Sequence, residues 1–168
     1  CDTSAQTNLD SVLKRVLKQQ QKSIEKKSIG IRVDFSDAWV KANNHEIEII
    51  LRNLLSNAIK FTPIEGNIRL TVHCDEREVE ISIKDTGTGF DFKENELFHP
   101  SKPGTAGERG LGIGLRVTQE LIKKNKGSLS IISQIGLGTT VQLRFLLAKP
   151  ETSCSFNKGR LLEQEAKS

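Results

Sequence analysis

The stretch of sequence from residue 45 to residue 63, HEIEIILRNLLSNAIKFTP, decides how the rest of the chain is organised. Its apolar residues recur at steps of three and four, the pattern of an amphipathic helix with one buried face. Asn53, Asn57 and Lys60 stand at i, i+4 and i+7, so they share a second, polar stripe of the same helix. Taken alone, this stripe is typical of a solvated helix surface, and only motifs further along the chain favour another interpretation.

Composition limits the classes of protein to consider. The 168 residues, 36% hydrophobic and 27% charged, predict one globular domain with a single core. No apolar run approaches the ~20 residues of a membrane span, and no signal peptide is visible.

The chain begins at Cys1 and contains no Met, so we expect a fragment or a processed product. Cys1, Cys74 and Cys154 lack metal-ligand spacing, which predicts reduced thiols in a cytosolic setting. The net charge of +4 is spread along the chain, so nucleic acid is not an expected partner.

The chain before the central helix contains a further helix and short strands. Residues 1–8 are polar and without periodicity, which predicts a loose, flexible terminus. Residues 9–27 combine an apolar stripe at helical spacing with a basic outer face, which predicts a helix packed on the core. A docking surface for a neighbouring domain is the alternative. Residues 31–35 alternate apolar and polar side chains and predict a half-buried strand, and Trp39 begins a second short extended piece.

The chain after the central helix alternates between hairpins and glycine-rich segments. Pro63 and Gly66 end the helix, and alternation over residues 67–83 predicts a β-hairpin with one buried face. Residues 91–110 show no period, and so long a connection is usually a functional lid or a disordered segment. The next helix ends with basic residues in its last turn and with Gly127 as a left-handed stop.

The last ordered elements settle the predicted fold class. Residues 129–132 and 140–147 are expected to form a closing hairpin, and the polar tail at 149–168 is expected to be disordered. Helices followed by hairpins with an interleaved helix predict an α+β fold. We expect a two-layer sandwich in which helices cover one face of a mixed, mostly antiparallel sheet.

Two glycine-rich turns leave a strand or open a helix, with the patterns Asp85-x-Gly87-x-Gly89 and Gly110-x-Gly112-x-Gly114. Backbone without Cβ can approach a purine or a phosphate closely and offer it N–H donors. Each turn alone is weak evidence, because a turn glycine is more often structural. The second turn is neither the dinucleotide fingerprint nor a P-loop, because its glycine spacing is wrong and no Gly-Lys-Ser/Thr follows.

The order of the motifs is more specific than any one of them. Along the chain they read Asn53-Leu-Leu-Ser-Asn57-Ala-Ile-Lys60-Phe61-Thr62, Asp85-x-Gly87-x-Gly89-Phe90, Gly110-Leu-Gly112-Ile-Gly114-Leu115 and Gly136-Leu-Gly138-Thr139-Thr140. This series resembles the asparagine box and the three glycine boxes of the ATP-binding catalytic domain of bacterial two-component sensor histidine kinases, within the GHKL ATPase/kinase superfamily. The resemblance covers residues 9–148 and implies the Bergerat-type ATP-binding fold.

The resemblance implies how adenine would bind. Asp85 would accept a hydrogen bond from the exocyclic amine of adenine, and guanine would be rejected because it presents a carbonyl there. Gly87 and Gly89 would let the backbone pass the purine. Thr139 would support the adenine pocket from its floor.

The resemblance also implies how Mg²⁺ and the phosphates would bind. Asn57 would give a carboxamide oxygen to Mg²⁺, with Asn53 one turn away and Lys60 beside the phosphates. These three are the predicted catalytic residues, acting by positioning and charge neutralisation of a transferring phosphoryl group. The nucleotide would also contact the start of the following helix, at Gly110, Leu111, Gly112, Gly114 and Leu115.

One difference from related members of the wider superfamily and two departures from the family refine this prediction. Related ATPases such as gyrase and the heat-shock chaperones carry a Glu where this chain has Asn53, which cannot act as a base, so we favour phosphotransfer over hydrolysis. His45-Glu46 imitates the phospho-acceptor dipeptide but adjoins the asparagine box, so we expect the acceptor elsewhere. The phenylalanine box is shortened to residues 97–100, where Phe98 is predicted to anchor the lid.

We interpret residues 9–148 as the cytoplasmic catalytic domain of a sensor histidine kinase. It would transfer the γ-phosphoryl group of Mg-ATP to a histidine on a dimerisation domain absent from this chain, with a response regulator downstream. The parent would be dimeric, and its membrane attachment is left open. A free-standing serine kinase and anti-sigma factor is one alternative, disfavoured by the helix at 9–27. A nucleotide-binding module without catalysis is another, disfavoured by intact Asn57, Lys60 and Asp85.

Overall fold

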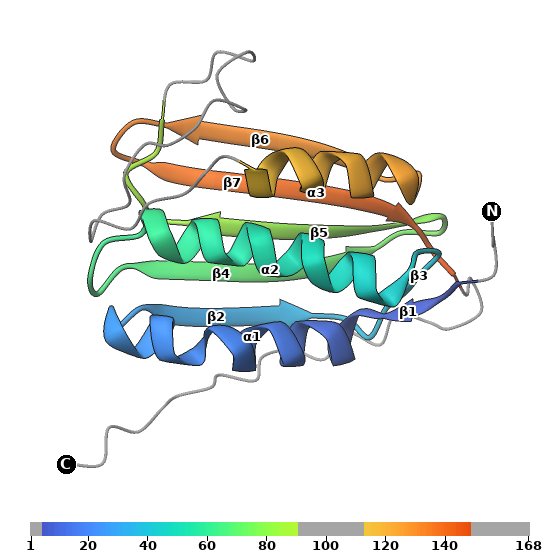
Figure 1. Cartoon of the computed structure of the whole chain (residues 1–168), viewed down its shortest axis with the longest axis horizontal. Coiled ribbons are helices and arrows are strands. Elements are labelled where there is room, and N and C mark those ends of the chain that lie inside the picture. The colour runs from blue at the N-terminus through green and yellow to red at the C-terminus, as the bar shows by residue number, and fades with distance from the viewer. Residues whose placement is uncertain (1–4, 91–112, 149–168) are drawn as a thin grey trace.

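A computed structural model describes residues 5–90 and 113–148 of the chain (Figure 1). The described helices are α1 (Leu9–Lys26), α2 (Asn44–Phe61) and α3 (Ile113–Lys124). The described strands are β1 (Thr7–Asn8), β2 (Gly30–Phe35), β3 (Trp39–Val40), β4 (Asn67–Cys74), β5 (Glu78–Asp85), β6 (Ser128–Gln134) and β7 (Gly138–Leu146).

The main sheet is mixed and has the strand order β2-β4-β5-β7-β6. β2 and β4 are parallel, and the other neighbouring strands are antiparallel. Lys84 of β5 is paired with Thr140 of β7. This register brings the end of β5, at Asp85, beside the turn that precedes β7.

α1, α2 and α3 lie side by side on one face of this sheet, as Figure 1 shows. The apolar stripe predicted for α2 is buried, from Ile47 at 0% exposed to Ala58 at 5%. It packs into one core with the inward residues of β4 and β5, such as Leu70 and Ile81. On the other face of the sheet, side chains such as His73 are exposed. The two-layer α+β sandwich predicted from the sequence is therefore confirmed.

The ends of α2 follow from its local sequence. Asn43 is the N-cap, and its Oδ1 accepts the backbone N–H groups of His45 at 3.0 Å and Glu46 at 3.2 Å. Such a side-chain acceptor satisfies donors that have no partner within the first turn. The helix ends at Phe61 with Thr62 as the C-cap, because Pro63 cannot continue it.

The structure differs from the sequence predictions at two chain segments outside the helices. The expected loose terminus does not extend to Thr7, which lies in β1 with its Oγ1 donating to Ala42 O at 2.8 Å. The left-handed residue after α3 is Lys126, with φ 56°, rather than Gly127. Gly127 is needed for a different reason, because a Cβ there would lie 2.6 Å from the ring of Phe145.

Several predictions fall on residues outside the described ranges. They concern the connection at 91–110 with Phe98, the tail at 149–168, the thiols of Cys1 and Cys154, and the phosphate-contacting residues Gly110, Leu111 and Gly112. Among the described residues, Cys74 forms no disulfide bond. None of the helices in this part of the chain is long and apolar enough to cross a membrane.

Candidate functional site

Asp85 ends β5 and is only 5% exposed. Its Oδ1 accepts two backbone hydrogen bonds, from the N–H of Gly87 at 2.8 Å and from the N–H of Thr139 at 3.1 Å. Burial raises the pKa of this carboxyl above its ordinary value, and the two N–H donors offset part of that effect. The carboxylate is thus held between two turns in surroundings that disfavour its charge.

The other carboxylate oxygen, Oδ2, receives no hydrogen bond from any residue that the structure describes. A carboxylate with little solvent contact gains free energy from each additional donor that reaches it. An N–H group of a ligand would be such a donor. Asp85 therefore offers one acceptor atom in a fixed position at the end of a strand, as recognition of an amino group requires.

The turn after β5 and the turn before β7 are packed on each other through glycines. A Cβ at Gly89 would overlap the carbonyl oxygen of Gln134, and a Cβ at Gly138 would overlap that of Asp85. Both glycines also have positive φ angles, +59° and +94°. The two segments can therefore pack this closely only because both residues lack a Cβ atom. This packing places Thr139 against Asp85.

Ser133 of β6 contributes a polar group to this pair of turns. Its Oγ lies 2.8 Å from Oγ1 of Thr139 and accepts the backbone N–H of Phe90 at 2.9 Å. The sequence predictions end this strand at residue 132, and β6 continues to Gln134. Alternation reports only which side chains are buried, so no sequence signal identifies Ser133. Thr139 supports Asp85 through its backbone N–H, while its hydroxyl contacts Ser133.

The polar stripe of α2 is half-buried and faces α3 at Asn53. The Nδ2 atom of Asn53 donates to the carbonyl oxygen of Gly114 and to Oγ1 of Thr118, both at 3.3 Å. Gly114 and Leu115 lie in the first turn of α3, which is the described part of the predicted phosphate-binding segment. Asn53 therefore holds that turn against α2.

Asn57 and Lys60 continue the stripe toward the end of α2. Asn57 makes no hydrogen bond to another described residue, and Nζ of Lys60 lies 5.0 Å from the ring centroid of Phe61. The described residues contain no group of three His, Cys, Asp or Glu side chains that could hold a metal ion. One amide oxygen suits Mg²⁺, a hard cation that keeps several waters and binds beside phosphates. Asn57 thus offers one oxygen of the kind that Mg²⁺ accepts as a ligand.

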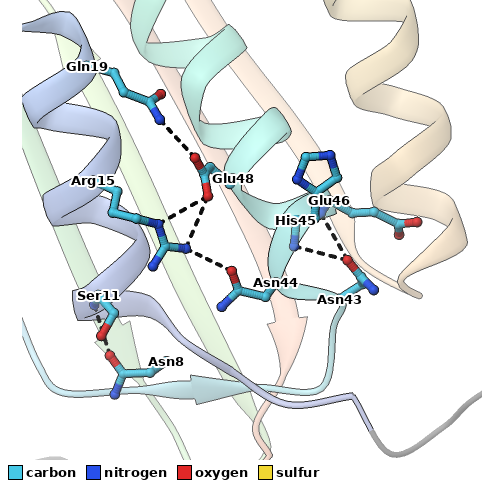
Figure 2. Close-up of polar contacts among 9 residues, drawn as sticks. All are labelled: Asn8, Ser11, Arg15, Gln19, Asn43, Asn44, His45, Glu46 and Glu48. Carbon is cyan, nitrogen blue, oxygen red and sulfur yellow. Dashed lines mark hydrogen bonds and ion pairs between the residues drawn. The ribbon is translucent and has the colours of Figure 1, made fainter.

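The first turns of α2 are engaged in contacts between helices. Figure 2 shows Glu48 accepting hydrogen bonds from Nε of Arg15 at 3.2 Å and from Nε2 of Gln19 at 2.9 Å, which ties α1 to α2. Glu46 is paired with Lys124 of α3. Both carboxyl pKa values are lowered, chiefly by the hydrogen bond from Gln19 to Glu48 and by that from Lys124 to Glu46. Glu48 therefore connects α2 to α1, Glu46 connects α2 to α3, and both have a structural role.

His45 is exposed in the first turn of α2. At a rise of 1.5 Å per residue it stands about 22 Å along the helix axis from Lys60. That distance separates it from the polar stripe near the end of the helix. That His45 is not the phospho-acceptor stays a prediction, and its distance from Lys60 along the helix supports that prediction.

Fold and sequence motifs together indicate an ATPase-type domain: helices on one face of a mixed sheet, and a glycine-bounded carboxylate at a strand end. Residues 42–149 match the family described as histidine kinase-, DNA gyrase B-, and HSP90-like ATPase. Because this range covers more than half of the chain, the protein belongs to that family.

The relatives with curated names include a sensor protein and a sensor histidine kinase. The chain is 39% identical over 109 residues to sensor protein EvgS of Escherichia coli O157:H7, covering 60% of this chain and 9% of that protein. It is 42% identical over 106 residues to sensor histidine kinase RcsC of Salmonella typhimurium, covering 60% of this chain and 11% of that protein. The chain thus spans about a tenth of the length of these relatives. The family resemblance predicted from the motifs is confirmed.

Solved structures support the fold. The mycobacterial sensor histidine kinase MprB is similar with a TM-score of 0.71 at 20% identity, covering 86% of this chain and 97% of that one. The catalytic domain of histidine kinase ThkA is similar with a TM-score of 0.72 at 22% identity, covering 84% and 96%. At these identities the likeness shows that the fold is shared.

Proposed function

We propose that residues 9–148 form the ATP-binding catalytic domain of a sensor histidine kinase. The domain binds Mg-ATP and transfers the γ-phosphoryl group to a histidine on a dimerisation domain in another part of the parent protein. A response regulator receives the phosphoryl group afterwards. A cytoplasmic location belongs to the same proposal, because ATP is supplied there.

The observation that carries the proposal is the state of Asp85. One oxygen of this buried carboxylate is held by two backbone N–H groups, and the other receives no donor from the described residues. The exocyclic amine of adenine is a donor of the required kind, whereas guanine would present a carbonyl and leave two acceptors facing each other. Asp85 therefore accounts for selection of ATP over GTP.

The phosphates are assigned to the side where α2 meets α3. Asn57 supplies a carboxamide oxygen to the metal, and Lys60 supplies positive charge. Bound Mg²⁺ would neutralise negative charge on the phosphates. Gly114 and Leu115 are in the first turn of α3, where backbone N–H groups suit an anion. Asn53 keeps this turn in place through its bonds to α3.

The chemistry proposed is transfer rather than hydrolysis. The bond between the γ-phosphorus and its bridging oxygen breaks, ADP leaves, and a bond forms to a ring nitrogen of the acceptor histidine, which loses its proton. Asn53 occupies the place of a general base and cannot accept a proton near neutral pH. We therefore expect slow ATP turnover by the domain alone. The relatives that are named histidine kinases favour this function over a free-standing serine kinase.

A calorimetric titration with a non-hydrolysable ATP analogue, with and without Mg²⁺, tests the proposal, and GTP is the control. We expect binding that Mg²⁺ strengthens and that GTP does not reproduce. Equal binding of the two nucleotides would contradict the role of Asp85. Absence of binding in every condition would contradict the proposed function.

A further inference from the structure

Lys27 follows α1 directly and is 4% exposed, although its side chain ends in an amino group. Its Nζ donates to three backbone carbonyl oxygens of one short segment: Ile59 at 3.0 Å, Lys60 at 2.9 Å and Thr62 at 3.3 Å. The carbonyl oxygen of Lys27 accepts the N–H of Glu65 at 2.8 Å. A lysine is rarely buried unless its donors are satisfied, and here these three acceptors lie at the end of α2.

The end of α2 needs such donors, because the last four carbonyl groups of a helix have no partner inside it. Thr62 satisfies the first of them through its N–H at 3.0 Å and its hydroxyl at 2.7 Å. The N–H of Thr88 reaches the carbonyl oxygen of Phe61 at 3.2 Å. Lys27 donates to the remaining two, the carbonyl oxygens of Ile59 and Lys60. A cation is also favoured at this pole of the helix dipole. Every carbonyl oxygen of residues 58–62 thus has a donor.

The end of α2 is in direct backbone contact with the turn that follows Asp85. Thr88, which is bonded to Phe61, lies in this turn. A Cβ at Gly87 would lie 2.7 Å from the same carbonyl oxygen of Phe61. Asn57 stands one turn earlier on the same helix. The position of the helix end therefore sets the spacing between the Asp85 turn and the polar stripe.

We propose that Lys27 is a positioning residue of the nucleotide site. Its buried amino group holds the end of α2 at the distance from the Asp85 turn at which one ATP molecule contacts both. The inference rests on the proposed function for its ligand and on the hydrogen bonds above for its geometry. Lys27 acts through the backbone at the end of α2 and does not itself touch the nucleotide.

α1 also supplies a matched control. Arg15 donates to Glu48 and to Asn44, with distances of 3.2 Å and 2.8 Å, at the opposite end of α2 (Figure 2). Lys27→Met and Arg15→Met each remove a basic group that donates to α2, Lys27 from the position just after α1 and Arg15 from within α1. The two variants differ in which end of the helix is released. An effect common to both would therefore reflect the general attachment of α1.

The experiment titrates both variants and the parent chain with a non-hydrolysable ATP analogue and Mg²⁺, at a temperature at which circular dichroism shows each chain to be folded. We expect Lys27→Met to bind about tenfold more weakly and Arg15→Met to stay within about twofold of the parent. Amide hydrogen exchange without nucleotide provides the second readout. The N–H of Thr88 should exchange faster in Lys27→Met and at the parent rate in Arg15→Met.

Unchanged affinity together with unchanged exchange of the Thr88 amide in Lys27→Met would overturn the inference, and so would equal losses of affinity in both variants. If Lys27→Met does not fold, Lys27→Gln, which has two N–H donors instead of three, replaces it. A smaller loss of affinity and faster exchange of the Thr88 amide are then expected, and parent values of both would overturn the inference. If the parent chain does not bind the analogue, the proposed function fails, and the exchange of Thr88 alone then decides whether Lys27 positions the turn.

Discussion

The backbone N–H of Thr139 lies 3.1 Å from Oδ1 of Asp85, across 54 positions of sequence. This hydrogen bond joins the end of β5 to the start of β7. It occupies the same oxygen that the N–H of Gly87 reaches, so Oδ2 is left for a donor from outside the described residues. The orientation of one carboxylate thus depends on the register of two neighbouring strands.

Asp85→Asn should separate nucleotide binding from folding. Asparagine keeps an oxygen for the N–H groups of Gly87 and Thr139 but places an NH₂ group where Oδ2 stood, facing the amine of adenine. We expect affinity for the ATP analogue to fall about 10- to 100-fold, measured by calorimetry, with no loss of stability in urea. Asp75→Asn is the control, because Asp75 also accepts two backbone N–H groups but lies beyond the opposite end of β5. Parent-like affinity of Asp85→Asn would refute the adenine contact.

The stability difference between the parent and Asp85→Asn should depend on pH with a definite sign. Burial raises the pKa of Asp85 in the folded chain above its ordinary value of 3.8. The folded chain therefore keeps a proton that the unfolded chain has already lost. The parent should lose stability relative to the variant as pH rises from about 3.8 through the raised pKa, and the difference should be constant above it. Urea unfolding at several pH values measures this, and a rise of relative stability over that interval would contradict the expectation.

Nucleotide affinity should follow the same titration in the opposite sense. As pH falls through the raised pKa of Asp85, the carboxylate gains a proton, and a proton on Oδ2 would face the adenine amine. Binding of the ATP analogue should weaken over that interval, which calorimetry at matched ionic strength can follow. Asp85→Asn should show no such component, and an identical pH profile in both chains would assign it to another group.

Glu46→Gln should lower stability without affecting the site. Glu46 is paired with Lys124 and accepts from Nδ2 of Asn125 at 2.6 Å, so the variant should lose about 1 kcal/mol at neutral pH. The folded-state pKa lies below 4.5, so this stabilisation is present above about pH 4.5 and is lost as pH falls through the folded pKa. Glu120→Gln is the control, because Glu120 and its partner Arg116 are 73% and 76% exposed. An ATP affinity that changes in Glu46→Gln would contradict the structural assignment.

Gly136, in the turn between β6 and β7, and Gly138, the first residue of β7, should respond differently to alanine. Gly136 has φ +80° but open space around a Cβ, so Gly136→Ala should cost about 1 kcal/mol for backbone strain alone. Gly138 has φ +94°, and its Cβ would overlap the carbonyl oxygen of Asp85. Gly138→Ala should therefore cost about 3 kcal/mol or more and weaken nucleotide binding. Urea unfolding compares the two, and equal losses would show that the turns are not tightly packed.

Much of the architecture was predictable because local patterns report burial. The spacing of apolar residues in 45–63 predicts α2 and its buried face, and the alternation over 67–83 predicts β4 and β5. The beginning of α1 at Leu9 and the short β3 at Trp39 follow from the same patterns. The order of the asparagine and glycine motifs predicts the family. These features were accessible because each depends on residues close together in the chain.

The sequence by itself determined the described helices, the strands of the main sheet, the faces they bury and the family to which the motifs belong, but it did not predict β1. Only the tertiary structure decided the contacts that shape the site: Thr139 with Asp85, Asn53 with α3, Ser133 with Thr139, and Lys27 with the end of α2. Lys27 and its acceptor Ile59, for example, are 32 positions apart. Periodicity determines the side on which a residue lies but not its hydrogen-bond partner, because that partner depends on strand register and on how helix ends pack on turns.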